Sequence, residues 1–429
     1  MRTLFFVGLS GCGANSKSTT RTEVVVCGEG THEDDGICVA DEESDTDTDT
    51  DTDTDTDTDT DTDTDTDTDT DTDTDTDTDT DAGIDLTAYP PDEPGPFQAA
   101  TLETSLVGST GVPLPVQVWY PTEDTEGDLH TYSGVLESGA LDDATPACDA
   151  HRPVLLFSHG NYSTRWLSGY LGEFLASHGW IVVAPDHTGN TLYDWDGTRL
   201  GEMVFRRPRD LTDAADWLYS TAGELTEGLA DCLNEDDGFA VAGHSFGGYT
   251  AAAIAGVEYS LSSSGYFCSL YPSYWLCDES YAWVMAHPEY ATWDLSDSRV
   301  WATVPMAPAG YEILYGGLDD VEVPAMLLGG QWDSVTSMEW SVNFIYDAIG
   351  SEDKYLGELH RAGHSAFISI CELWPESDEC DSPFLEESAS HAQVQAITLA
   401  FLRMVQGDES AADYLPPDSD LWTFTEGPR

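Results

Sequence analysis

The chain has 429 residues, enough for one large domain with additional segments, and hydrophobic residues make up 40% of it. Its 82 acidic residues against 14 basic ones give a formal net charge of −68. A surface this acidic repels the phosphate backbone of nucleic acids, so we expect no nucleic-acid partner.

The segment 1–12 resembles a bacterial lipoprotein signal. A short apolar stretch at 3–9 follows Met1 and Arg2, and residues 9–12 read Leu-Ser-Gly-Cys. This stretch is too short to span a bilayer. The resemblance implies that Cys12 is lipidated and that the protein belongs to the bacterial cell envelope, as an outer-membrane lipoprotein or a cell-surface or secreted protein. We expect contact with a membrane only through this anchor; the alternative is an ordinary N-terminus.

Nine cysteines are present, and lipidation of Cys12 would leave an even number, as in exported proteins with disulfide bonds. The predicted pairs are Cys27–Cys38, Cys268–Cys277, Cys371–Cys380 and, from the two that remain, Cys148–Cys232. The sequence does not fix this connectivity. Zinc ligation is the alternative, but no Cys-x-x-Cys pair occurs, and we predict no metal site.

Residues 13–97 are predicted to form a disordered tether. Their main feature is a strict Asp-Thr alternation at 45–81, which places like charges at every second position and contains no apolar residue. Such a segment cannot bury a core and should stay extended. A calcium-binding loop is the alternative, but the glycine and the terminal glutamate of an EF-hand loop are missing.

Residues 98–410 are predicted to form an α/β domain, followed by a C-terminal tail at 411–429. Short apolar runs predict strands at 116–120, 153–157, 180–184, 239–242, 300–306 and 324–328. Helical spacing of apolar residues predicts helices at 166–178, 210–219, 249–255, 335–349 and 392–404. Alternation of strands and helices indicates a mostly parallel, twisted sheet covered by helices on both faces.

The sequence Gly-His-Ser-Phe-Gly at 243–247 fits the pattern G-x-S-x-G. It lies between the predicted strand 239–242 and the helix 249–255, where a sharp turn holds the serine in a strained conformation with its hydroxyl exposed. Glycines are needed because side chains there would collide with neighbouring backbone. The motif therefore predicts Ser245 as a nucleophile and His244 as structural; a glycine-rich structural turn is the alternative.

A serine nucleophile needs a base, which follows serine and acid in the order Ser, Asp/Glu, His. We predict His364, which lies in a loop of small residues before the last helix. The alternatives are His287, His360 and His391. Asp333 comes just after the predicted strand 324–328 and is the predicted acid, whereas Asp319 and Asp320 precede that strand.

An oxyanion hole requires two backbone N–H groups directed at the developing negative charge. Phe246, directly after the nucleophile, supplies one of them. The other is assigned to Asn161 in the loop that follows Phe157, with Tyr162 as the fallback. Tyr162 and Trp332 are candidates for substrate binding, with ordinary packing as the alternative for each.

Four motifs together resemble those of predicted dienelactone-hydrolase-like esterases: Ser-His-Gly at 158–160, Ala-Pro-Asp-His at 184–187, Arg-Arg-Pro-Arg-Asp at 206–210 and Gly-His-Ser-Phe-Gly-Gly at 243–248. They are also similar to those of platelet-activating-factor acetylhydrolases and cutinase-like polyester hydrolases. The resemblance covers about residues 100–405. It implies an α/β-hydrolase fold and serine-dependent ester hydrolysis without metal or cofactor.

The segment 256–299 departs from the shortest members of these families, because it carries two cysteines and many aromatic residues. It is predicted to be either a small cap over the site or a surface insertion. The expected function is a secreted or surface-anchored, monomeric serine hydrolase that cleaves carboxylic esters of small-molecule, lipid or polyester type. The alternatives are a lipase or phospholipase-like acetylhydrolase, a polyester hydrolase, or a binding protein on a catalytically dead scaffold.

Overall fold

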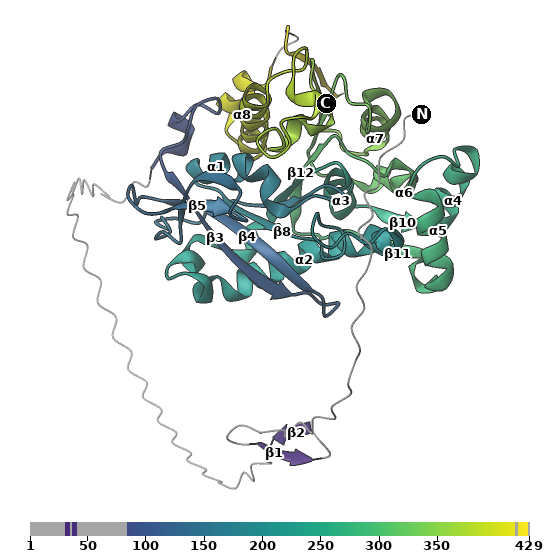
Figure 1. The fold of residues 1–429 in the computed structure, drawn as a ribbon, viewed down its shortest axis with the longest axis horizontal. Coiled ribbons are helices and arrows are strands. Elements are labelled where there is room, and N and C mark those ends of the chain that lie inside the picture. Colours follow the sequence, from purple (N-terminus) through teal and green to yellow (C-terminus); the bar gives the residue numbers. More distant parts are fainter. Residues whose placement is uncertain (1–30, 35–36, 41–83, 417–418, 428–429) are drawn as a thin grey trace, which may run out of the picture. The chain divides into compact units, whose positions relative to one another are not determined.

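The computed structural model describes residues 31–34, 37–40, 84–416 and 419–427, and the chain divides into two units, Met1–Asp77 and Thr78–Arg429 (Figure 1). In the first unit, strands β1 (Thr31–Asp34) and β2 (Ile37–Ala40) pair antiparallel. The predictions for the signal segment, the lipidated Cys12 and the Asp-Thr repeat fall on residues outside the described ones, and so does Cys27 of the predicted Cys27–Cys38 pair.

The second unit is built on an 11-stranded sheet with the order β15-β14-β13-β12-β9-β7-β8-β4-β3-β6-β5. Strands β8, β7, β9, β12, β13 and β14 are parallel neighbours, while β15 and β4 join them antiparallel. The strand bounds are β3 Gln98–Val107, β4 Pro113–Thr122, β5 Leu129–Tyr132, β6 Leu136–Asp142, β7 Val154–Ser158, β8 Ile181–Pro185, β9 Phe239–His244, β12 Val300–Met306, β13 Ala325–Gly330, β14 Lys354–Leu359 and β15 Trp422–Glu426.

Helices cover both faces of this sheet. Helices α1 (Gly169–Ser177) and α8 (Glu387–Val405) pack on one face, and α2 (Leu200–Leu225) and α3 (Phe246–Ile254) pack on the other (Figure 1). Strand β7 shows how the sequence produces this, because side chains alternate across a strand. Its Leu155 joins the core of α1 and α8, and its Leu156 joins the core of α2 and α3. The predicted mostly parallel sheet between two helical layers is confirmed.

Helix α2 begins ten residues before the predicted 210–219 helix and contains Pro208 in its interior. Proline removes one backbone donor and usually ends or bends a helix. Here apolar side chains before and after it, such as Val204 and Leu211, lie on the same buried side of the helix. Burial of this long apolar stripe outweighs the local cost of the proline.

Segments predicted to lie outside the domain contact it in the structure. Before β3, the Gly95 amide donates to the Ser177 hydroxyl at 3.1 Å, and the Arg403 guanidinium donates to the Tyr89 carbonyl at 2.6 Å. After residue 411, β15 forms the strand that pairs with β14. The predicted helix 335–349 is divided into a π-helical turn, Met338–Val342, and the short helix α7, Asn343–Ala348.

The insertion 256–299 forms a small substructure between α3 and β12. Strands β10 (Glu258–Ser260) and β11 (Thr292–Asp294) pair antiparallel, and helices α4 (Leu261–Leu270) and α5 (Cys277–Ala286) lie between them in sequence (Figure 1). The disulfide Cys268–Cys277 joins the two helices. The predicted pairs Cys148–Cys232 and Cys371–Cys380 are also present. Across the described ranges, no helix combines the length and apolar character that a membrane crossing requires.

Candidate active site

Ser245 lies in the sharp turn between β9 and α3. Its backbone has φ 58° and ψ −117°, a strained conformation for a residue with a side chain. The flanking glycines are required by close backbone contacts: a Cβ on Gly243 would lie 2.3 Å from the Gly247 carbonyl oxygen, and one on Gly247 only 1.8 Å from that of Ser158. The Ser245 amide donates to Met306 at 2.9 Å, so the neighbouring strand holds the strained turn in place.

His364 and Asp333 form a hydrogen-bonded pair. The histidine Nδ1 lies 2.8 Å from the Asp333 Oδ2, and the Asp333 side chain is fully buried. Asp333 also accepts hydrogen bonds from the amides of Val335 and Thr336 and from the Thr336 hydroxyl at 2.7 to 2.8 Å. Burial alone would raise the pKa of Asp333, but the hydrogen bond and charge of His364 and the bonds from Thr336 lower it overall. The carboxylate is therefore ionised at neutral pH.

The pair and Ser245 lie at one end of the sheet. Ser245 follows β9, Asp333 follows β13 and His364 follows β14, all at the carboxyl ends of parallel strands, where α/β sheets place their ligands. His244, next to the nucleophile, contacts His364 directly: its Nε2 is 2.8 Å from the His364 carbonyl oxygen and the two ring centroids are 4.7 Å apart. Burial, and then the charge of His364, lower the pKa of His244 to about 3, so its ring is neutral.

The loop after β7 passes beside the nucleophile. A Cβ on Gly160 would lie 3.3 Å from the Ser245 Cβ, so glycine permits this approach. The Tyr162 amide donates to the Asn190 carbonyl at 3.1 Å, which leaves the Asn161 amide as the better candidate donor in this loop. Phe246 occupies the first turn of α3, where backbone amides have no acceptor within the helix.

A buried polar network that includes Arg207 of α2 supports the loop after β7. Arg207, fully buried in α2, donates to the Ser158 hydroxyl at 3.1 Å, to the Asn190 side-chain oxygen at 2.5 Å and to the His159 carbonyl. His187 bridges the Ser158 hydroxyl and the Asp210 carboxylate, at 2.9 Å to each. The sequence motifs at 158–160, 184–187 and 206–210 therefore meet here. Their structural role was missed from the sequence, although charged residues inside a buried helix face were a signal.

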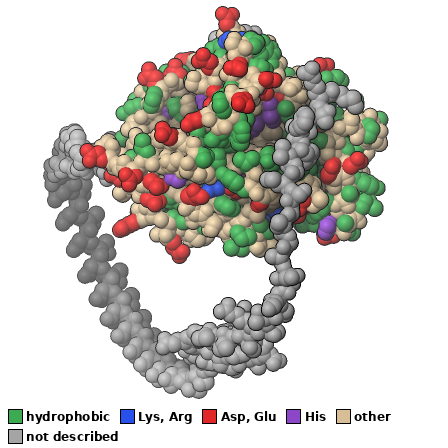
Figure 2. All heavy atoms as spheres, viewed as in Figure 1, with side chains coloured by type: hydrophobic (Ala, Val, Ile, Leu, Met, Phe, Trp, Pro, Cys, Tyr) green, Lys and Arg blue, Asp and Glu red, His purple; other side chains and the backbone are tan. Residues whose placement is uncertain are grey.

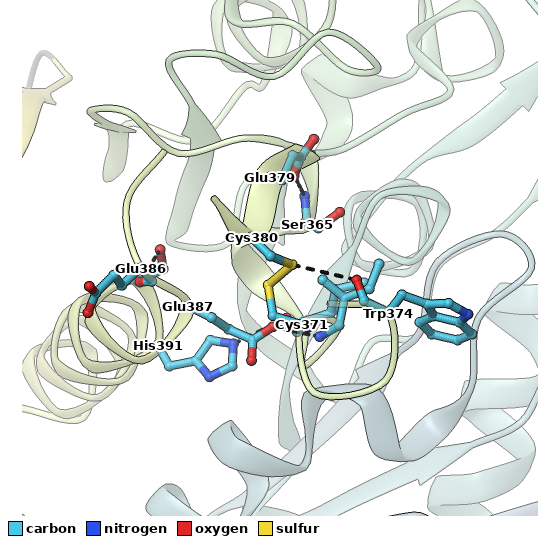
Figure 3. The surroundings of a disulfide bond; sticks show 11 residues. Ser365, Cys371, Trp374, Glu379, Cys380, Glu386, Glu387 and His391 are labelled. Atoms are coloured by element: carbon cyan, nitrogen blue, oxygen red, sulfur yellow. Dashed lines mark hydrogen bonds between the residues drawn. A yellow bond between two sulfur atoms is a disulfide. The ribbon is translucent and has the colours of Figure 1, made fainter. Parts of the chain in front are cut away.

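Glu379 and a disulfide hold the loop that carries His364 and Ser365. Figure 3 shows the Glu379 contact with Ser365 and the nearby disulfide. The Glu379 carboxylate accepts the His364 amide at 3.2 Å and the Ser365 amide at 2.6 Å. Gly363 leaves room for this contact, since a Cβ there would lie 2.4 Å from the Glu379 carboxyl carbon. Cys380, the next residue, is bonded to Cys371, so the disulfide restrains Glu379. Sequence reasoning found the cysteine pair but not this function of Glu379.

A pocket of about 560 Å³ opens beside the His364–Asp333 pair. It lies between the loop that joins α4 to α5 and the segment after β13. The predicted substrate-binding residues Tyr162 and Trp332 do not line this pocket. Tyr162 is 54% exposed and packs against Trp195, and Trp332 is 38% exposed and packs against Phe384. The residues that line the pocket are Tyr271, Ser273, Tyr274, Trp275, Ala309, Gly310, Glu312, Val335, Thr336, Ser337, Trp340 and Ser341.

Among the residues that the structure describes, no group of three or more His, Cys, Asp or Glu side chains could hold a metal ion. The chemistry available at this site is that of a hydroxyl nucleophile, an imidazole paired with an ionised carboxylate, and backbone N–H donors.

Two comparisons with known proteins bear on the fold and on the class of reaction. A family model described as Chlorophyllase matches residues 138–267, which include the Ser245 turn and the loop after β7 but neither Asp333 nor His364. The protein is also 26% identical to Cutinase est2 of Thermobifida alba over 214 residues, 50% of this chain and 53% of that protein. The matched segment therefore spans about half the length of this curated relative.

The fold, with its parallel sheet, two helical layers and strand-turn-helix serine, is the α/β-hydrolase fold. Both similarities are to enzymes whose names denote ester hydrolysis, which supports an ester hydrolase of this fold.

Proposed function

We propose that the protein is a secreted or surface-anchored, monomeric serine hydrolase that cleaves carboxylic esters, with Ser245, His364 and Asp333 as its catalytic residues. The observation that carries this proposal is the 2.8 Å bond between His364 and the buried, ionised Asp333 beside the strained Ser245 turn. A carboxylate in this position fixes the histidine tautomer and stabilises the imidazolium that forms during catalysis.

The proposed reaction has two steps. His364 Nε2 takes the proton from Ser245 as its hydroxyl attacks the ester carbonyl, and then gives that proton to the leaving alcohol. The N–H groups of Phe246 and Asn161 hold the oxyanion. In the second step, His364 takes a proton from water, which attacks the acyl-enzyme and releases the acid, and the proton returns to the serine. The hydrogen bonds of Arg207 keep the loop after β7 in position for these steps, and those of Glu379 do the same for the loop that carries His364.

Hydrolysis of short-chain p-nitrophenyl esters by the full chain tests this proposal. We expect Ser245→Ala to lower kcat by about 10⁴-fold or more, since removal of a triad member leaves only the contributions of the oxyanion hole and binding. Ser269→Ala, at an exposed position of α4, is the matched control and should retain activity. A fluorophosphonate probe should label the wild-type protein but not Ser245→Ala. Folded wild-type protein that neither hydrolyses these esters nor takes the label would instead point to a binding protein on a dead scaffold.

Export and anchoring are a separate part of the proposal. They are supported by the lipoprotein-like segment 1–12 and by the three disulfides found among the described residues, since disulfides are typical of oxidising compartments. We expect the wild-type protein in the membrane fraction of the cell envelope, and Cys12→Ser in the soluble fraction. Equal distribution of the two proteins would contradict lipidation at Cys12.

A polyester substrate is the second candidate, and the similarity to a protein named as a cutinase supports it. A lipase or acetylhydrolase differs in its preferred acyl chain. Rates on p-nitrophenyl esters of increasing chain length, beside release of acid from a polyester film, separate these activities. A polyester hydrolase releases soluble acid from the film, whereas an enzyme restricted to small esters does not.

A further inference from the structure

The walls of the pocket beside the His364–Asp333 pair are aromatic. Tyr271, Tyr274 and Trp275 come from the loop between α4 and α5, and Trp340 comes from the π-helical turn. The Tyr274 hydroxyl donates to the Trp340 carbonyl at 3.0 Å, which joins the two walls. Tyr271, Trp275 and Trp340 are 43%, 38% and 53% exposed, so their rings are accessible to a ligand.

Three residues that line this pocket contact the proposed catalytic residues or their neighbours. Trp275 packs edge-on against Phe246, the residue after the nucleophile, with ring centroids 5.3 Å apart. Thr336, another lining residue, lies 3.1 Å from His364 Nδ1 through its hydroxyl. The Ala309 amide, also at the pocket, donates to the Ser245 carbonyl at 3.0 Å. A group bound in the pocket would therefore lie next to an ester held at Ser245.

One buried carboxyl group lines the pocket without a counter-ion. Glu312, in the short helix α6 (Tyr311–Leu314), is 1% exposed, and its Oε1 accepts the Leu276 amide at 3.1 Å. Within the described part of the chain, no Lys, Arg or His forms an ion pair with it, and none lines the pocket. Burial raises the pKa of Glu312 to about 7. A buried carboxyl group without a counter-ion destabilises a fold, and a cation in the pocket would compensate for it.

We infer that this pocket binds the quaternary ammonium group of a cationic ester, of which a choline ester is the simplest example. The inference rests on the proposed esterase function and names the substrate class of that site. Accessible Trp and Tyr rings attract a quaternary ammonium through cation–π contacts, and such a group needs no hydrogen-bond acceptor. A cation bound in the pocket favours the ionised form of Glu312, whose negative charge then lies at the wall of the pocket.

The charge of the whole protein favours the same substrate. Acidic side chains are spread over the face seen in Figure 2, where few Lys or Arg side chains occur. A net charge of −68 raises the local concentration of cations and lowers that of anions. A neutral alcohol group could pack against the aromatic walls of the pocket but would leave Glu312 without a counter-ion. An anionic group would be repelled.

Binding can be measured without catalysis in full-length Ser245→Ala. Choline is titrated by calorimetry, beside the neutral alcohol in which a tert-butyl group replaces the trimethylammonium group. We expect choline to bind about tenfold more tightly, the order of one cation–π and charge contact. In the Ser245→Ala background, Glu312→Gln, which keeps an acceptor for Leu276, should remove this difference, and Trp340→Leu, at an exposed position, should weaken choline binding. Glu339→Gln, exposed beside Trp340, removes the same charge outside the pocket and should have no effect.

Hydrolysis by the wild-type chain gives the second measurement. Butyrylcholine and its tert-butyl analogue have the same shape, so the ratio of their kcat/KM values reports the charge. A ratio of about ten that falls to about one in Glu312→Gln supports the inference. A ratio near one in the wild type, with p-nitrophenyl esters still cleaved, would overturn it while leaving the esterase in place. Choline binding dependent on Glu312 without hydrolysis of any ester would instead sink the proposed function and retain the ligand class.

Discussion

Arg207 and Glu312 are both buried ionisable side chains near the proposed catalytic site, but their surroundings differ. Arg207 donates hydrogen bonds to Ser158, Asn190 and the His159 carbonyl, and its charge is balanced by Asp210 nearby. Glu312 accepts a backbone amide, has no counter-ion among the described residues, and lines an open pocket. The surroundings of Arg207 are those of a structural network, whereas the surroundings of Glu312 are those of a ligand-binding site.

The largest effect is expected at Arg207 and tests whether its network stabilises the fold. Arg207→Met should lower the free energy of unfolding by about 3–5 kcal/mol, because removal of one charged member leaves the rest of a buried network unpaired. Urea denaturation measures it. Arg209→Met is the control on the same helix, since its side chain is 53% exposed and its ion pair should contribute at most about 1 kcal/mol. Equal losses of unfolding free energy in the two variants would show that the buried network stabilises the fold no more than an exposed ion pair does.

A smaller effect, with a defined pH dependence, is expected at Glu312. Its pKa in the folded protein is raised from 4.5 to about 7, so the folded state holds the proton more tightly than the unfolded state. The stability that this proton contributes is present below about pH 4.5 and is lost as the pH rises to about 7. The free energy of unfolding of Glu312→Gln, measured relative to that of wild type, should therefore rise by about 3 kcal/mol from about pH 4 to about pH 8.

Urea denaturation of both proteins at the two pH values measures this gain. Asp210, whose pKa burial also raises to about 7, titrates in both proteins and cancels in the difference. A constant difference between wild type and Glu312→Gln across this pH range would show that folding leaves the pKa of Glu312 unchanged, and the contrast with Arg207 would be lost.

The smallest effect is expected at Glu379. Its surroundings are intermediate between those of Arg207 and Glu312, because its side chain is partly buried and accepts hydrogen bonds from two backbone amides. Glu379→Gln keeps only one acceptor oxygen, so the His364 loop should shift slightly and kcat should fall roughly tenfold while KM stays near its value. Steady-state kinetics on a p-nitrophenyl ester measures both constants. Glu376→Gln, exposed in the same disulfide loop, is the control. An unchanged kcat in Glu379→Gln would show that the disulfide alone fixes the loop.

The parts of the site that the sequence predicted are those fixed by local pattern and chain order. The turn around Ser245 is a contiguous motif, and Asp333 and His364 each follow a strand, so parallel strands bring them to one edge. The structure brings Asp333 and His364 into contact as expected. The Asn161 assignment followed from its place in the loop after a predicted strand, and the structure adds that the Tyr162 amide donates to the Asn190 carbonyl.

The rest depends on contacts between distant segments, which no local pattern encodes. The pocket combines Trp275, Glu312 and Trp340, which lie in three different elements. The role of Glu379 required the path of the disulfide loop around His364. The start of α2 was misplaced because burial across Pro208, rather than local propensity, decides where this helix begins.

The position of β15 affects how the domain is completed during synthesis. This strand leaves the ribosome after every other strand of the sheet, yet it pairs with β14, the strand that leads to His364. Until β15 has been made, β14 presents an unpaired edge, the kind of surface on which chains associate with one another. Protection of that edge, and with it the final position of the strand before His364, therefore comes only after the rest of the sheet has been made.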